Sequence, residues 1–138
     1  MAVAFHRMMS DSFALRMAEL DMLLEQCREH SPFADSVIRD TSNRSGRDWP
    51  WWSVEIERTE VNVQEKRRIS AEIRLNSTQE GEPGSFEAIW MARAWEGVSA
   101  DSFRARGSWP LAWNRPAPAD LQATMIALLN TAQGSFVK

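Results

Sequence analysis

Few side chains in this sequence have the type and spacing that catalysis or metal binding requires. The only histidines are His6, near the start of the chain, and His30, at the expected end of a helix. A histidine-based metal site would therefore need carboxylates as its remaining ligands. Cys27 lies on the apolar stripe of that helix, which is typical of a core thiol rather than a nucleophile. No glycine-rich loop carries a phosphate-binding lysine, and no serine lies in a nucleophile elbow. The sequence thus predicts no catalytic residue, no cofactor and no metal site.

Paired carboxylates are the remaining candidates for chemistry. Glu55 and Glu57 are expected to point outward from one strand, but a general acid needs a desolvated pocket to raise its pKa. A pocket between helices and sheet, lined by Trp52, Trp90 and Trp109, would make the chain a small enzyme or ligand carrier. We favour the interpretation that these three tryptophans are the core itself.

The composition indicates one soluble globular domain over residues 1–138. Hydrophobic residues make up 43% of the 138 and charged residues 25%, the balance of a folded rather than a disordered chain. The net charge of −3 argues against bulk electrostatic binding to nucleic acid. No apolar run is long enough to cross a membrane, and the first residues lack the pattern of a secretory signal. We therefore expect a cytoplasmic protein without membrane contact.

Two amphipathic helices are predicted at the ends of this domain. In the first, at about residues 11–30, apolar side chains recur every three or four residues and share one face: Phe13, Met17, Leu20, Leu24 and Cys27. The second begins near Asp120, ends near Gly134 and has the same kind of stripe: Leu121, Met125, Leu128, Leu129 and Ala132. Residues 1–10 are expected to be a frayed N-terminus, 33–40 a short helical turn and 41–48 a mobile polar loop.

Between the helices the hydrophobic period changes to two, which predicts four strands. They begin near Trp51, Arg68, Phe86 and Phe103, with a bulge near residues 58–60 where the apolar phase slips by one. Pro110 is expected to end the last strand. Short connections favour an antiparallel meander. The predicted fold is a two-layer α+β domain in the order helix, four-stranded antiparallel meander, helix. Both helices cover one face of the sheet, and the other face is exposed.

The exposed sheet face is the predicted binding surface. It displays arginines and glutamates around an apolar group formed by Ile89, Met91 and Trp95. Solvated cross-strand ion pairs would explain the charges, but contiguous exposed apolar area usually marks a contact surface, where arginine and aromatic residues are enriched. The predicted partner-binding residues are Arg68, Glu72, Arg74, Glu87, Met91, Arg93, Trp95, Arg104 and Arg106.

A protein is the predicted partner of this face, and the chain is expected not to be an enzyme. The acids of the face balance its arginines and no RNA-recognition motif occurs, so nucleic acid is disfavoured. The acidic net charge favours a basic toxin or a secreted client. Small acidic α+β domains without catalytic groups are typical of bacterial immunity proteins and secretion chaperones. The similarity is one of fold class and size, and no sequence motif supports it. A homodimer through Met91 and Trp95, or cover by a loop at 41–52, would also shield the apolar residues.

Overall fold

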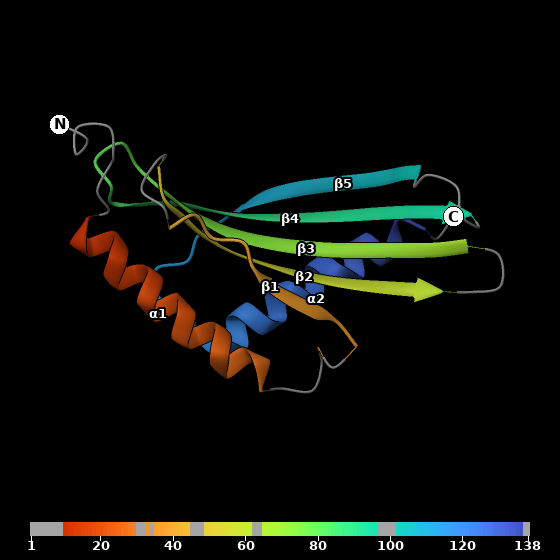
Figure 1. Cartoon of the computed structure of the whole chain (residues 1–138), viewed down its shortest axis with the longest axis horizontal. Helices are drawn as coiled ribbons and strands as arrows, with labels where there is room; N and C mark the ends of the chain where they lie inside the picture. The colour runs from red at the N-terminus through yellow and green to blue at the C-terminus, as the bar shows by residue number, and fades with distance from the viewer. Residues whose placement is uncertain are drawn as a thin grey trace.

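Two helices and five antiparallel strands make up the part of the chain that the structure describes (Figure 1). The computed structural model describes residues 10–29, 33, 35–44, 49–61, 65–96 and 102–136, without the side chains of 61, 65, 95, 96 and 102–104. The elements are α1 (Asp11–Arg28), β1 (Val37–Asp40), β2 (Trp51–Val61), β3 (Glu65–Ser77), β4 (Pro83–Glu96), β5 (Ser102–Leu111) and α2 (Pro118–Gly134). The strands lie in chain order, β1-β2-β3-β4-β5. The predicted α+β class and antiparallel sheet are therefore confirmed.

The predicted number of strands, four, is wrong because residues 37–40 form β1 rather than a helical turn. β1 pairs antiparallel with β2, and Ile38 lies opposite Ile56. Val37 and Ile38 are β-branched, which favours extended backbone. Ile38 also packs against the core from its half-buried position, so burial adds to this preference and the segment completes one edge of the sheet.

The apolar stripes predicted for both helices are buried in one core. Every residue predicted for them is at most 6% exposed. α2 packs against β3 and β4, whereas α1 packs across α2 and reaches the sheet at β4. The helices therefore contribute unequally, and the prediction that both cover one face of the sheet is matched only in part, because α2 lies against the sheet whereas α1 packs mainly on α2. The inward sheet residues in this core are Trp52, Val54, Ile56, Ile69, Ala71, Ile73, Leu75, Phe86, Ala88 and Ala92.

The start of α1 is attached to a turn of the sheet. Ser10 Oγ accepts a hydrogen bond from the backbone N–H of Phe13 at 3.1 Å, as an N-cap residue does. The same hydroxyl donates to the carbonyl oxygen of Gly81 in the β3–β4 turn. Gly81 has φ 81°, in the left-handed region that favours glycine. The rest of the predicted frayed N-terminus, residues 1–9, lies outside the described residues.

The register of β2 against β3 is unbroken. It runs from Trp51 opposite Asn76 to Val61 opposite Lys66, so the bulge predicted near residues 58–60 is wrong. Arg58 occupies an inward position, where its guanidinium donates to Gln133 Oε1 of α2 at 2.9 Å. The apolar pattern stops there because a charged side chain meets a polar partner, and the backbone does not slip.

The irregularities lie at other points of the sheet. One register shift falls between Leu75 and Ser77 of β3. A second, at the Ala92–Arg93 step of β4, pairs Arg93 with Phe103. The last strand therefore pairs irregularly with β4 at its first residues.

Pro110 does not end β5, contrary to the sequence-based prediction. It lies opposite Glu87 of β4, and the strand continues to Leu111. β5 is the last strand of the sheet. An edge strand tolerates proline because the missing N–H can fall on the side without a neighbouring strand.

The contact between Trp90 and Gly107 gives a test of the fold. The two residues are opposite each other on β4 and β5, and a Cβ built at Gly107 would lie 2.4 Å from Trp90 Nε1. Gly107→Ala should displace the indole and lower the free energy of unfolding by about 1–3 kcal/mol, as overpacking does. Urea denaturation measures the change.

Gly134→Ala is the matched control, since no atom lies within 4 Å of a Cβ built there. Its free energy of unfolding should stay the same or rise. Equal stability of the two variants would contradict the close packing of Trp90 on β5.

Candidate functional site

The face of the sheet opposite the core is covered by neither described helix, because the apolar stripes of α1 and α2 both join the core on the other side. We call it the open sheet face. Its described residues near the centre and toward β5 are Glu55, Glu57, Arg68, Ser70, Glu72, Arg74, Glu87, Ile89, Met91, Arg93, Arg106 and Ser108, and Ser53, Thr59 and Lys66 point to the same side nearer the strand ends. The register sets their neighbours: Glu72 lies between Glu55 and Ile89, and Ser70 lies between Glu57 and Met91.

Most of the predicted partner-binding residues come together on the open sheet face. Glu87 and Arg106 are exposed, and the others whose side chains are described are half-buried among their neighbours: Arg68, Glu72, Arg74, Met91 and Arg93. The side chains of Trp95 and Arg104 lie outside the described residues. For these two, the assignment to the binding surface stays a prediction.

A hollow of about 180 Å³ lies near the middle of the open sheet face. Its lining residues are Glu55, Glu57, Arg68, Ser70, Met91 and Arg93. Ser70 is the short side chain of this set, and its longer neighbours rise around it. Met91 supplies apolar surface on the β4 side of Ser70, whereas Glu57 lies on the β2 side of Ser70 and Arg93 follows Met91 along β4. The hollow can therefore accept a side chain with an apolar stem and a polar or charged end.

Ion pairs organise the charges around this hollow. Arg39 of β1 lies 3.1 Å from Glu55 and 3.7 Å from Glu57, and Arg68 lies 3.7 Å from Glu57. Such partly exposed pairs contribute about 0–1 kcal/mol each. Their role here is to hold the glutamates in place. Sequence reasoning missed Arg39 because β1 was expected to be helical; the β-branched pair Val37-Ile38 was the available signal.

Glu55, Glu57 and Ser70 were recognised from the alternation as outward-facing but were not assigned to the binding surface. Their contribution depends on which residues of β3 and β4 lie beside them. The inter-strand register decides this, and the pattern within one strand does not reveal it.

Glu72 is the open-face carboxyl with the most perturbed ionisation. Burial raises its pKa above the ordinary value near 4.5, and the negative charges of Glu55 and Glu87 act in the same direction, against the guanidinium of Arg74. Arg74 lies 3.4 Å from Glu72. The centre of the open sheet face therefore holds its negative charge less readily than an isolated glutamate would.

Two further hollows lie away from the centre. One, of about 380 Å³, is lined by Ile89, Arg106, Gly107 and Ser108 on β4 and β5. The other, of about 250 Å³, lies beside α1 and is lined by Arg16, Glu19, Leu20, Leu23, Arg115 and Pro116. The hollow lined by Ile89 and Arg106 lies on the open sheet face toward the β5 edge. This face therefore has two depressions, that one and the hollow over Ser70.

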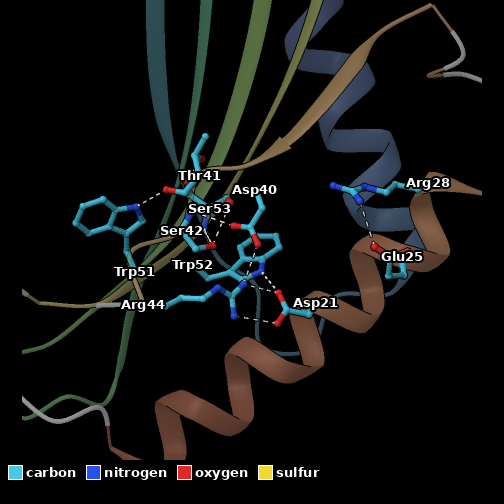
Figure 2. Close-up of polar contacts among 10 residues, drawn as sticks. All are labelled: Asp21, Glu25, Arg28, Asp40, Thr41, Ser42, Arg44, Trp51, Trp52 and Ser53. Atoms are coloured by element: carbon cyan, nitrogen blue, oxygen red, sulfur yellow. Dashed lines mark hydrogen bonds and ion pairs between the residues drawn. The ribbon is translucent and has the colours of Figure 1, made fainter. Parts of the chain in front are cut away.

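A polar network fastens the segment after β1 to α1 (Figure 2). Arg44 donates two hydrogen bonds to the carboxylate of Asp21, at 3.1 and 2.8 Å, and a third to Asp40 Oδ2 at 3.0 Å. The buried indole of Trp52 donates to Asp21 Oδ1 at 3.1 Å. Bidentate arginine–carboxylate pairs fix orientation as well as distance. The network therefore holds the β1 edge, and with it Arg39, beside β2.

The start of the predicted mobile loop pairs with β2. Thr41 N–H donates to Ser53 O at 3.0 Å, and Asn43 and Trp51 exchange two backbone hydrogen bonds. Ser53 is fully buried, and its hydroxyl contacts that of Thr41 (Figure 2). Residues 41–44 therefore lie along the β2 edge, and residues 45–48 lie outside the described part of the chain.

Metal-ligating side chains and the cysteine thiol are the other groups with a possible chemical role. No group of three or more His, Cys, Asp or Glu among the described residues could hold a metal ion. Cys27 is buried in the core, and burial raises the pKa of its thiol. His6 and His30 lie outside the described residues. No helix in the described ranges is both long and apolar enough to cross a membrane.

Comparisons with protein-family models, with curated proteins and with solved structures found no match for this chain.

The raised pKa of Glu72 gives a test by pH. A carboxyl whose pKa is higher in the folded than in the unfolded state favours folding below the unfolded pKa, and this advantage is lost as the pH rises through the folded pKa. Glu72→Gln should therefore unfold at higher denaturant than the wild type at pH 7, and the difference should shrink toward pH 4. Denaturation from pH 4 to 8 measures it.

Asp40→Asn is the control with the opposite sign. Burial acts to raise the pKa of Asp40, but hydrogen bonds from Ser42 and the guanidinium of Arg44 outweigh it and lower that pKa. Asp40→Asn should lower the free energy of unfolding at pH 7, and this difference from the wild type should become smaller as the pH falls through the folded pKa of Asp40. A Glu72→Gln effect that is independent of pH would show that Glu72 is not desolvated.

Proposed function

We propose that this chain is a non-enzymatic protein-binding module whose open sheet face receives a partner protein. The observation that carries the proposal is the hollow over Ser70, which is lined by the apolar side chain of Met91, the carboxylates of Glu55 and Glu57 and the guanidiniums of Arg68 and Arg93. A surface that combines apolar floor, arginine and acid is typical of the centre of a protein interface.

The charge of the open sheet face favours a partner of mixed sign. Its described residues include four carboxylates, four guanidiniums and the ammonium of Lys66, apart from Arg39 at the β1 edge. Both signs are interspersed, so complementarity has to come largely from pairing individual charges. Such pairing gives specificity more than affinity. Neutralisation of a toxin and escort of a secreted client are the two roles that we propose for the module, because both need a specific protein contact and no chemistry.

The packing of the core favours this function over a ligand pocket between helices and sheet. Trp52 is fully buried and its indole N–H is satisfied by Asp21. Trp90 and Trp109 are half-buried and pack against the same core. The three hollows described above lie on the open sheet face and beside α1. A small enzyme or ligand carrier stays the alternative, and a metabolite that raises the melting temperature would support it.

Filling the hollow tests the proposed function. Ser70→Arg places a long cationic side chain over the floor of the hollow, whereas Asn130→Arg adds the same charge on the exposed side of α2. Wild-type chain immobilised as bait should capture a stoichiometric protein from the source cells. The Asn130→Arg variant should capture it equally, and Ser70→Arg should bind the purified partner at least about tenfold more weakly, because blocking a hot spot costs about 2 kcal/mol or more and about 1.4 kcal/mol corresponds to tenfold.

Circular dichroism and urea denaturation should show that both variants stay folded, since residues 70 and 130 lie outside the core cluster. Capture that Ser70→Arg leaves unchanged would place the contact elsewhere on the chain. Recovery of no stoichiometric protein by the wild type would count against a protein-binding role altogether.

A further inference from the structure

The outward side of α1 carries an apolar stripe whose two large side chains are exposed. Leu15 and Met22 are each 66% exposed, and with Val37 they are the large hydrophobic side chains that the described part of the chain exposes. Leu15, Ala18 and Met22 are spaced i, i+3 and i+7, so they form one line along the helix. We call these three residues the outer stripe. It lies opposite the buried stripe that contains Phe13 and Leu20.

Single exposed hydrophobic residues are ordinary on protein surfaces, but two aligned on one helix at this spacing resemble the anchors by which amphipathic helices are recognised. The stripe lies on the side of α1 opposite its buried residues, which pack into the core. It is therefore separate from the open sheet face.

Carboxylates border the outer stripe. Asp11, Glu19, Glu25 and Glu29 are exposed on this side of the helix or at its ends. The guanidiniums of α1 lie to the sides: Arg16, whose side chain is 13% exposed, pairs with Glu19 at 2.9 Å, and Arg28 pairs with Glu25 at 3.2 Å. α1 with its C-cap residue Glu29 contains five acidic and two basic residues. Its net charge of −3 equals the net charge of the whole chain.

This distribution separates two kinds of surface. The excess negative charge belongs to α1, whereas the open sheet face carries interspersed charges of both signs. An apolar line flanked by carboxylates is complementary to an amphipathic helix that presents hydrophobic anchors flanked by lysine or arginine. We propose that the outer stripe of α1 is a second docking surface and that its occupant is a basic amphipathic helix of a partner protein.

A second copy of this chain fits the surface less well. Pairing two copies of α1 through the outer stripe would place Glu19 and Glu25 of one copy against the carboxylates of the other, and like charges across an interface are repulsive. The stripe has three residues, far below the area that a stable dimer interface buries. A basic helix avoids the repulsion, because its cations are attracted to the carboxylates that border the stripe, and a peptide contact need not bury the area of a stable dimer.

Designed peptides test this proposal on the full chain. The probe is an 18-residue helical peptide with leucine at i, i+3, i+4 and i+7 spacing and lysine elsewhere. Two comparison peptides have the same composition in scrambled order, or glutamate in place of lysine. Fluorescence anisotropy should show binding of the basic amphipathic peptide, weaker binding of the scrambled one and none of the acidic one. Added salt should weaken the binding.

Leu15→Ser with Met22→Ser removes the outer stripe, and Val37→Ser is the matched control, because Val37 is also a large exposed side chain, at 53%, but lies on β1. The double variant should fold normally, since both positions are exposed, and should lose about tenfold or more in affinity for the basic peptide. The Val37→Ser variant should keep wild-type affinity.

Three results would overturn the proposal. One is equal affinity of the wild type and the double variant. Another is equal binding of the ordered and scrambled peptides, which would reduce the contact to net charge. The third is a wild-type dimer in sedimentation that the double variant loses, because the occupant would then be a second copy of this chain.

Discussion

The burial of one sheet face determines what the opposite face can present. Side chains alternate along a strand, so once Trp52, Ile56 and Ile73 lie under the helices, the residues between them must point the other way. The unbroken register of β2 against β3 carries this alternation across all eleven residues of β2. A slip of one residue would bury glutamates and expose the core. The open sheet face is thus a consequence of the core.

The edge of the sheet depends on a small set of polar contacts. Asp21 of α1 accepts hydrogen bonds from both Arg44 and the buried indole of Trp52 (Figure 2). These contacts hold the segment after β1 against β2, and β1 carries the arginine that pairs with Glu55 and Glu57. The same helix exposes its acidic, apolar-striped side to solvent. α1 therefore supports one candidate surface through its inner side and forms the other with its outer side.

The amino-acid pattern was sufficient for the helices and for most of the sheet. The stripes from Phe13 to Cys27 and from Leu121 to Ala132 depend only on local spacing, and both are buried as predicted. β1 was missed because four residues are too few to show a period. The expected bulge in β2 was wrong because Arg58 finds a polar partner on α2, and no local signal announces a contact with a residue so distant in the sequence.

The candidate site was predictable only in part, for a related reason. Alternation shows that Arg68, Met91 and Arg93 share a face, and the structure brings them together around one hollow. Alternation within a strand does not show that Glu55 and Glu57 also line this hollow, because the strand pairing decides which residues lie beside them. The net charge likewise did not reveal that acidic residues are concentrated on α1, because it adds the charges of the helix to those of the sheet.

The accessibility of the hollow is the property on which the proposed function depends, and thiol labelling measures it most directly. In a Ser70→Cys variant, the new thiol should react with a small maleimide in the folded, isolated chain, while the buried Cys27 stays protected until the chain unfolds. Ser53→Cys should also be protected, since Ser53 faces the same side but is fully covered. A purified partner should then slow labelling at residue 70. Protection of that thiol in the isolated monomer would mean that the chain covers its own sheet face, and the face would not be available to a partner.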